Sequence, residues 1–185
     1  MIIGLTGKAR SGKDTIADYL AKHHMLDVIS FAQPVKAGVI AAFGLEPDKP
    51  DEDREQVIPH IGKSKRELYQ LFGTEFGRDM IDHDIWVKMA QHNLNKARNA
   101  PYYYTDWQGA VFTDVRFDNE AEFIKRNGGI IIEVIRDNAP KVRAHVSEEG
   151  INEQFIDYVI FNNGTIDELH AEVDSILKME ANNAA

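Results

Sequence analysis

Near the amino end of the chain, a loop with glycines at fixed positions lies between a short apolar run and a helical pattern. The loop reads Gly7-Lys8-Ala9-Arg10-Ser11-Gly12-Lys13-Asp14-Thr15; it follows Ile2–Thr6 and opens a helix predicted over Lys13–Lys22. Its glycines allow successive backbone amides to point at a polyphosphate, the helix amino terminus adds partial positive charge, and Lys13 can reach the β and γ phosphates. The loop therefore predicts an α/β fold with a phosphate-binding strand-to-helix junction.

The position after Lys13 departs from the strict form of this motif. Ser or Thr usually follows the lysine and holds magnesium, whereas this chain has Asp14 there and Thr15 next. A carboxylate is a hard oxygen ligand that can hold Mg²⁺ directly or through water, and a threonine hydroxyl can do the same. Both Asp14 and Thr15 are therefore candidate metal ligands.

Short apolar runs alternate with helical patterns along the whole chain. Strands are predicted over Ile2–Thr6, Val28–Phe31, Ala110–Val115, Ile130–Ile135 and Asp157–Phe161. Helices are predicted over Lys13–Lys22, Val35–Phe43, Ser64–Phe76, Asp84–Ala97 and Asp118–Asn127, and from Thr165 onward. Strands that are nearly all apolar suit a parallel sheet covered on both faces. We expect a three-layer α/β fold with a mainly parallel five-stranded sheet and helices on both faces, forming one domain over 1–180.

Two polar excursions interrupt the alternation, and a polar tail ends the chain. Glu46–Pro59 is acidic and contains three prolines, and Arg136–Gly150 separates the last two predicted strands. Long excursions in such folds often close over ligands, although each can equally be a solvated loop. The tail, 181–185, is expected to fray.

Composition excludes several classes of protein. The 185 residues include 21 Lys and Arg against 30 Asp and Glu, a net charge of −9, and no cysteine. The acidic balance argues against a nucleic-acid coat or a polybasic membrane anchor, and the lack of cysteine excludes disulfides and thiolate zinc sites. With no secretory signal and no apolar stretch of the roughly 20 residues that a membrane helix needs, we expect a cytoplasmic protein.

Polar and charged groups follow the predicted strands where ligands of an open α/β sheet collect. Asp114 and Arg116 follow the third strand, Arg136 the fourth, and Asn162-Asn163-Gly164-Thr165 the fifth. Because the carboxyl ends of parallel strands share one edge, these groups are expected beside the phosphate loop. In an acidic chain, such a local cluster can attract an anionic substrate.

The phosphate loop with Asp14 in the Ser/Thr position resembles that of the bacteriophage-type deoxynucleoside monophosphate kinases. Further stretches agree with that family in order: Ala32-Gln33-Pro34-Val35-Lys36, Asp53-Arg54-Glu55, Leu71-Phe72-Gly73-Thr74-Glu75, Trp86-Val87-Lys88, Asp114-Val115-Arg116 with Glu120, His145-Val146-Ser147-Glu148, and Asn162-Asn163-Gly164-Thr165 with Glu168-Leu169. Together they span nearly the whole chain. Their joint order carries the resemblance, since only the phosphate loop is specific by itself.

The resemblance implies a P-loop kinase fold with a monophosphate-binding segment at about 34–80 and a lid at about 136–150. It implies transfer of the γ-phosphoryl group of ATP to a deoxynucleoside monophosphate (dNMP) with Mg²⁺, which supplies DNA precursors, in the host cytoplasm if the chain is phage-encoded. A homodimer is possible. The implied catalytic residues are Lys13, Arg54, Asp114 and Arg116. The implied ATP-binding residues are Gly7, Arg10, Ser11, Gly12, Lys13, Asp14, Thr15, Arg136, Asn162 and Gly164. The implied acceptor-binding residues are Lys36, Arg54, Arg66, Gln70, Gly73, Thr74, Trp86, Asp114, Arg116 and Glu120.

The residue types suit a phosphate acceptor, but alternatives stay open. A phosphate monoester is mostly a dianion at neutral pH, so it needs arginine to neutralise its charge rather than a general base. An alcohol acceptor, as in dephospho-coenzyme A kinase, would use an acid such as Asp114 as its base. A non-catalytic nucleotide-binding module is a third possibility. Trp86 can also be a core residue, Arg54 a surface partner of Asp51 or Glu55, and Arg66 an exposed helix residue.

Overall fold

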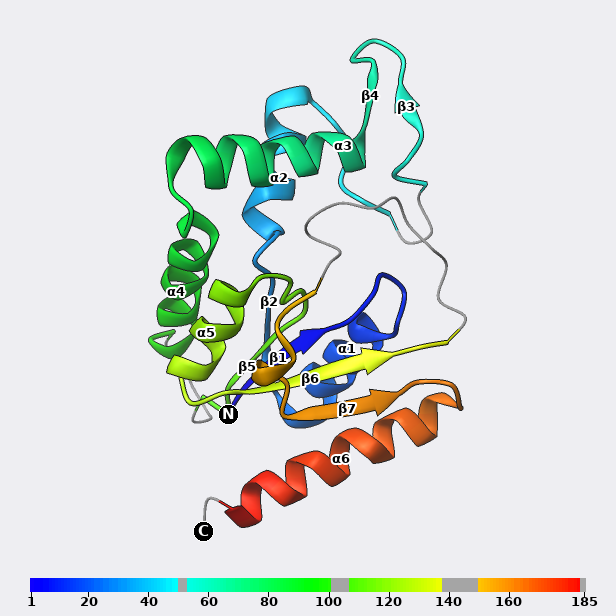
Figure 1. The fold of residues 1–185 in the computed structure, drawn as a ribbon, viewed down its shortest axis with the longest axis vertical. Helices are drawn as coiled ribbons and strands as arrows, with labels where there is room; N and C mark the ends of the chain where they lie inside the picture. Colours follow the sequence, from blue (N-terminus) through cyan, green and yellow to red (C-terminus); the bar gives the residue numbers. More distant parts are fainter. Residues whose placement is uncertain (50–52, 101–106, 138–149, 184–185) are drawn as a thin grey trace. The chain divides into compact units, whose positions relative to one another are not determined.

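The computed structural model describes residues 1–49, 53–100, 107–137 and 150–183. Its contacts separate the chain into two compact units (Figure 1). We call Met1–Ser30 with Asn93–Ala185 the sheet unit and Phe31–His92 the helical unit. The phosphate loop belongs to the sheet unit, and the predicted monophosphate-binding segment, about 34–80, lies within the helical unit.

The sheet unit is built on five strands. They are β1 (Ile2–Thr6), β2 (Asp27–Ile29), β5 (Ala110–Phe112), β6 (Ile130–Ile135) and β7 (Tyr158–Phe161), and their order in the sheet is β2-β5-β1-β6-β7. Every pairing in this sheet is parallel. The carboxyl ends of the strands therefore share one edge, as Figure 1 shows for β1, β6 and β7. This confirms the expected parallel five-stranded sheet.

Helices cover both faces of this sheet. On one face, Ile3 and Leu5 of β1 pack in a common core with residues of α1 (Lys13–His24) and α6 (Ile166–Asn183). On the other face lies α5 (Asp118–Arg126): a Cβ added to Gly4 would lie 3.1 Å from Ile124 Cγ1. The side chains of a strand alternate between faces, so the apolar run of β1 serves both layers. The three-layer α/β fold is confirmed.

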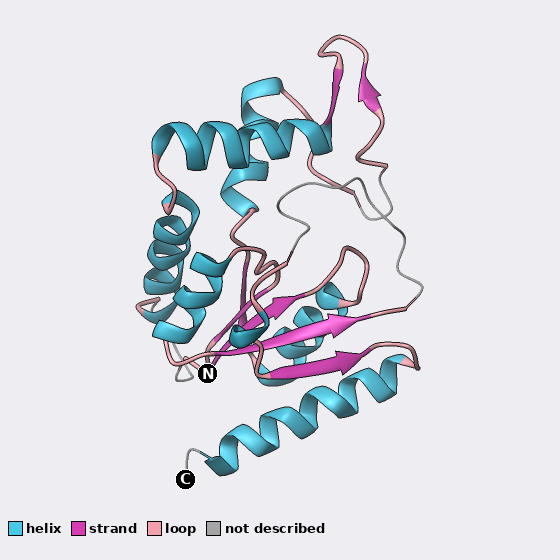
Figure 2. Cartoon of the chain, in the orientation of Figure 1, coloured by secondary structure: helices cyan, strands magenta, loops and turns pink. Residues whose placement is uncertain are grey.

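The helical unit contains short helices and one hairpin. Its elements are α2 (Gln33–Phe43), the antiparallel pair β3 (Val57–Ile58) and β4 (Lys63–Ser64), α3 (Lys65–Gln70), the π-helix η1 (Leu71–Ile81), and the start of α4 (Ile85–Arg98) (Figure 2). Ser64 caps α3 as its sequence predicts, because Ser64 Oγ accepts from Glu67 N and Glu67 Oε2 accepts from Ser64 N.

The structure differs from the sequence-based expectation mainly at element ends. The helix expected over Ser64–Phe76 divides into α3 and η1 and continues to Ile81, and the β3–β4 hairpin begins inside the expected excursion Glu46–Pro59. The last helix runs to Asn183, into the tail expected to fray, and a 3₁₀ turn, η3 (Glu153–Phe155), precedes β7. Within the described residues, no helix combines the length and apolar character that crossing a membrane requires.

Candidate active site

The phosphate loop adopts a conformation that requires its two glycines. Gly7 and Gly12 have φ angles of 120° and 113°, which side chains rarely allow. A Cβ at Gly7 would collide with the carbonyl oxygen of Val134, and one at Gly12 would collide with the side-chain amide of Asn162. The loop is therefore packed against the ends of β6 and β7, and its curvature follows from backbone sterics.

Lys13 folds back over the loop that precedes it. Its Nζ donates to the carbonyl oxygens of Gly7 at 2.8 Å and Lys8 at 2.7 Å, and lies 3.5 Å from Ser11 Oγ. Ser11 is fully buried, whereas Arg10 is exposed with a φ of 62°. These contacts hold the ammonium group over the curled backbone, where a bound phosphate chain would meet it.

Asp14 and Thr15 lie in the first turn of α1, and both are exposed. Their oxygens are of the hard type that Mg²⁺ prefers, so both side chains fit the expected metal position. In the part of the chain that the structure describes, no three His, Cys, Asp or Glu side chains form a metal-binding group. Magnesium usually takes most of its ligands from phosphate oxygens and water.

Asp114 and Glu120 follow β5, and each makes a specific contact. Ser30 Oγ donates to Asp114 Oδ2 at 2.8 Å, which orients this carboxylate at the end of β2. Glu120 is buried, and its Oε2 accepts from the backbone amides of Arg116 at 2.8 Å and Phe117 at 3.2 Å. Glu120 thus holds the start of α5 in place, while its role toward a substrate stays a prediction. The contact of Ser30 was not foreseen from the sequence.

The segment after β7 is tied directly to the phosphate loop. Asn162 Nδ2 donates to the carbonyl oxygen of Ser11 at 2.7 Å, and Asn162 N donates to the carbonyl oxygen of Ile135 at 2.7 Å. Asn163 pairs with Asp137, the neighbour of the exposed Arg136. Asn162 is thus the link between loop and strand edge, a role that its sequence position alone did not specify.

A cavity of about 270 Å³ lies beside this link. Its lining is Phe161, Asn162, Gly164, Thr165, Glu168, Leu169 and Glu172. Hydrogen bonds from the Thr165 amide and hydroxyl lower the pKa of Glu168, so this lining carboxylate is ionised at neutral pH. Asn162 and Gly164, two of the expected ATP-binding residues, therefore border a cavity. Sequence reasoning missed Phe161 and Glu172 as residues that line this cavity.

Within the helical unit, the basic residues expected to bind the acceptor are held by carboxylates. Lys36 Nζ and Arg54 Nε lie 3.5 and 3.4 Å from Asp48 Oδ2, and Arg66 Nε lies 3.2 Å from Glu55 Oε1. Burial alone would raise the pKa of Asp48, but the Tyr69 hydrogen bond and the charges of Arg54 and Lys36 outweigh it and hold the pKa low. Sequence reasoning missed Asp48, because nothing in the sequence distinguishes it from the other acidic residues of Glu46–Pro59.

Trp86 is a buried residue of the same unit. Its Nε1 donates to the carbonyl oxygen of Gly73 at 2.7 Å, its ring lies against Gly77, and it packs near Phe72. The indole therefore braces η1, and a substrate contact stays a prediction. Gln70 and Thr74 lie half-buried on the same helical stretch. Of the expected lid at about 136–150, residues 138–149, which include the His145-Val146-Ser147-Glu148 stretch, lie outside the described residues.

The family model for deoxynucleotide monophosphate kinases matches residues 52–173 of this chain. A protein of Acanthamoeba polyphaga mimivirus, whose name assigns it to the same family, is 31% identical over 95% of both chains. The chain belongs to the deoxynucleotide monophosphate kinase family. It is therefore a kinase, and the resemblance to the bacteriophage-type enzymes is confirmed. The deoxynucleotide monophosphate kinase of Enterobacteria phage T4 is 25% identical over 96% of this chain and 99% of its own.

Two further matches are to proteins whose names do not assign them to this family. A dephospho-CoA kinase of Corynebacterium glutamicum is 24% identical over 95% of this chain and 94% of its own. Among solved structures, a protein of Thermus thermophilus has a TM-score of 0.53 at 16% identity and covers 97% of both chains. The structural match supports the fold alone.

Proposed function

We propose that this kinase transfers the γ-phosphoryl group of ATP to a deoxynucleoside 5′-monophosphate in the presence of Mg²⁺, giving the diphosphate and ADP. The observation that carries the proposal is the phosphate loop with the Lys13 ammonium held over it, in a chain that belongs to this family. The diphosphates would supply DNA precursors. A homodimer stays a prediction.

On the donor side, Gly7, Arg10, Ser11 and Gly12 would present backbone amides to the ATP phosphates. Lys13 would add a positive charge next to the bond that breaks, where negative charge moves during transfer. Bound Mg²⁺, held by Asp14 or Thr15, would neutralise charge on the β and γ phosphates. The cavity beside Asn162 and Gly164 is the proposed adenine site. Arg136, whose neighbour Asp137 pairs with Asn163, is a further proposed ATP-binding residue.

On the acceptor side, the attacking group would be the phosphate of the dNMP. This phosphate is already mostly a dianion at neutral pH, so the chain needs cations to bring it up to a second anion rather than a base. Lys36, Arg54 and Arg66 of the helical unit and Arg116 of the sheet unit would supply this charge. Asp114, fixed by Ser30, would act as a ligand of water around magnesium or of a sugar hydroxyl.

A second candidate acceptor is an alcohol, since a dephospho-CoA kinase is also a relative. In that case Asp114 would take the proton of the attacking hydroxyl. The deciding experiment is an ADP-release assay with ATP, Mg²⁺ and a panel of the four dNMPs, dephospho-CoA and a sugar acid. We expect turnover with one or more dNMPs. Turnover with dephospho-CoA alone would replace the proposal by the alternative, and ATP binding without any turnover would indicate a non-catalytic module.

A further inference from the structure

Four side chains of the helical unit converge on the carboxylate of Asp48. Oδ2 faces Lys36 Nζ at 3.5 Å and Arg54 Nε at 3.4 Å, while Oδ1 accepts from the Tyr69 hydroxyl at 2.6 Å and lies 3.8 Å from Lys65 Nζ. These partners come from α2, from the loop before β3, and from α3. One carboxylate therefore joins three separate segments of the unit.

The partners divide into a buried pair and an exposed pair. The Lys65 side chain is 10% exposed and also donates to the carbonyl oxygen of Glu46 at 2.8 Å, so it anchors Asp48 from inside, together with Tyr69. Lys36 and Arg54 are 39% and 45% exposed, so each faces solvent as well as Asp48. Asp48 itself is 13% exposed. The buried pair, Lys65 and Tyr69, fixes the carboxylate. The carboxylate in turn holds the exposed pair, Lys36 and Arg54, near one point, and we call these two residues the outer cations.

The charges of this cluster leave a surplus that matches a phosphate. Lys65 balances Asp48, and the outer cations then present two positive charges, which equals the charge of a monoester phosphate above its second pKa of about 6. Oδ2 of Asp48 is buried, and at 3.5 Å from Lys36 Nζ and 3.4 Å from Arg54 Nε it restrains these two cations mainly by charge. Long flexible cations held this way lose less conformational entropy when a ligand binds.

We propose that Asp48 is the positioning residue of the acceptor-phosphate site: anchored by Lys65 and Tyr69, it holds Lys36 and Arg54 together so that the phosphate of a dNMP meets both. This inference rests on the proposed function and adds to it a residue that does not itself touch the substrate. Asp48 acts through Arg54 and Lys36, because an anion would not approach a carboxylate.

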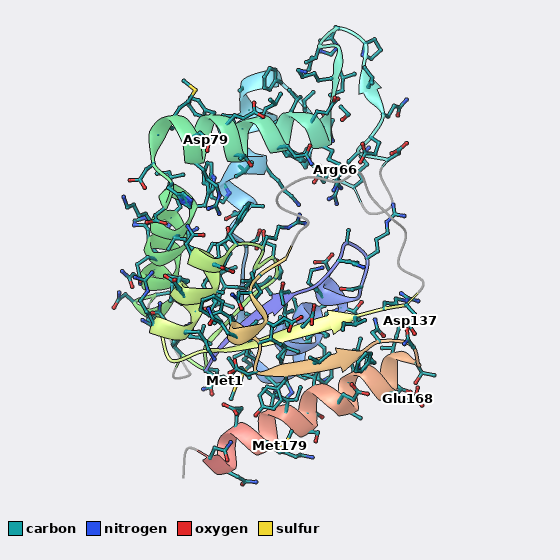
Figure 3. The ribbon with its side chains drawn as sticks, viewed as in Figure 1. Met1, Arg66, Asp79, Asp137, Glu168 and Met179 are labelled. Carbon is teal, nitrogen blue, oxygen red and sulfur yellow. The ribbon has the colours of Figure 1, made fainter. Side chains whose placement is uncertain are left out.

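The test is the substitution Asp48→Asn, which keeps the shape and the acceptor for Tyr69 but removes the charge. We expect KM for the dNMP to rise by about tenfold or more while KM for ATP stays unchanged, since the outer cations are no longer held together. Asp79→Asn is the matched control: it removes the same charge from an exposed residue of η1, and Figure 3 shows Asp79 and Arg66 at opposite ends of the α3–η1 stretch. An unchanged or lower KM for the dNMP in Asp48→Asn would overturn the proposal.

A second measurement separates positioning from a merely structural role. In an Arg54→Ala background, Asp48→Asn should add less than about threefold to the dNMP KM, because one of the two cations through which Asp48 acts is gone. An undiminished effect there would overturn the proposal. Tyr69→Phe, which removes one hydroxyl, should raise the same KM by a smaller factor, and it provides a readout if Asp48→Asn folds poorly.

Calorimetric binding of the dNMP without ATP distinguishes this inference from the proposed function. If the wild type binds the dNMP, Asp48→Asn weakens binding and no phosphoryl transfer occurs, the proposed function fails and the inference stands. If transfer occurs and both proteins bind the dNMP equally, the inference fails and the function stands. If the wild type binds neither dNMP nor inorganic phosphate, the inference is wrong.

Discussion

The phosphate loop of the sheet unit and the Asp48 cluster of the helical unit, each proposed to hold a phosphate, are built by different physical means. The loop is fixed by backbone sterics at Gly7 and Gly12 and by neutral hydrogen bonds such as that from Asn162 to Ser11. The cluster is fixed by charge around Asp48. A geometric site is sensitive to changes of shape, whereas a charge-built site is sensitive to pH, salt and loss of a single charge.

The largest expected effect is on the loop. Lys13→Ala should lower kcat by about 10³-fold or more, because it removes a charge that matters most in the transition state. The measurement is steady-state ADP release at saturating ATP and dNMP. Lys22→Ala, an exposed lysine in the last turn of the same helix, should leave kcat unchanged. Near-normal turnover of Lys13→Ala would contradict the proposed role of the phosphate loop in phosphoryl transfer.

The next effect concerns the arginines of the two units. Arg54→Ala and Arg116→Ala should each raise KM for the dNMP by about 10- to 100-fold, with KM for ATP unchanged, because each removes a charged partner of the acceptor phosphate. Arg126→Ala, at the exposed end of α5, is the control. Equal dNMP KM values in wild type and variants would mean that these arginines are structural.

A smaller effect tests the neutral hydrogen bond from Asn162 to Ser11 of the phosphate loop. Asn162→Ala should lower the free energy of unfolding by about 1 kcal/mol and raise KM for ATP a few-fold, since the carbonyl oxygen of Ser11 loses its donor. Chemical denaturation and ATP kinetics measure the two effects. Asn163→Ala, which loses only an exposed contact with Asp137, should show neither. If Asn162→Ala had the same free energy of unfolding and the same KM for ATP as Asn163→Ala, the loop would hold its shape without Asn162.

The smallest effect concerns pH. The pKa of Asp48 lies below the ordinary carboxyl value of 3.8, so its stabilisation is fully present above that pH and is lost as the pH falls through the lowered pKa. Asp48→Asn should therefore lower Tm by about 2 to 4 °C near neutral pH and by progressively less in acid. Thermal unfolding followed by circular dichroism measures this difference. A Tm difference that is independent of pH would indicate that lost packing, not lost charge, destabilises the variant.

The comparison of the two units also shows where the sequence is informative. The strands Ile2–Thr6 and Ile130–Ile135 have the expected bounds, because long buried apolar runs have few other ways to fold. The phosphate loop is recognisable because its glycines occupy positions that no other residue fits. The β3–β4 hairpin and the π-helix η1 were not predicted, since both depend on packing between segments that the local pattern does not encode.

By itself, the sequence determined the three-layer α/β fold with its parallel sheet, because buried apolar runs predict such strands. It also determined the phosphate loop, through glycines at strained backbone angles, and the family, through the order of its motifs. Only the tertiary structure decided that Asn162 holds Ser11, that Ser30 orients Asp114, and that Asp48 gathers cations from three segments. Such contacts join residues distant in the chain, and the identity of a side chain does not reveal which partner folding brings within reach.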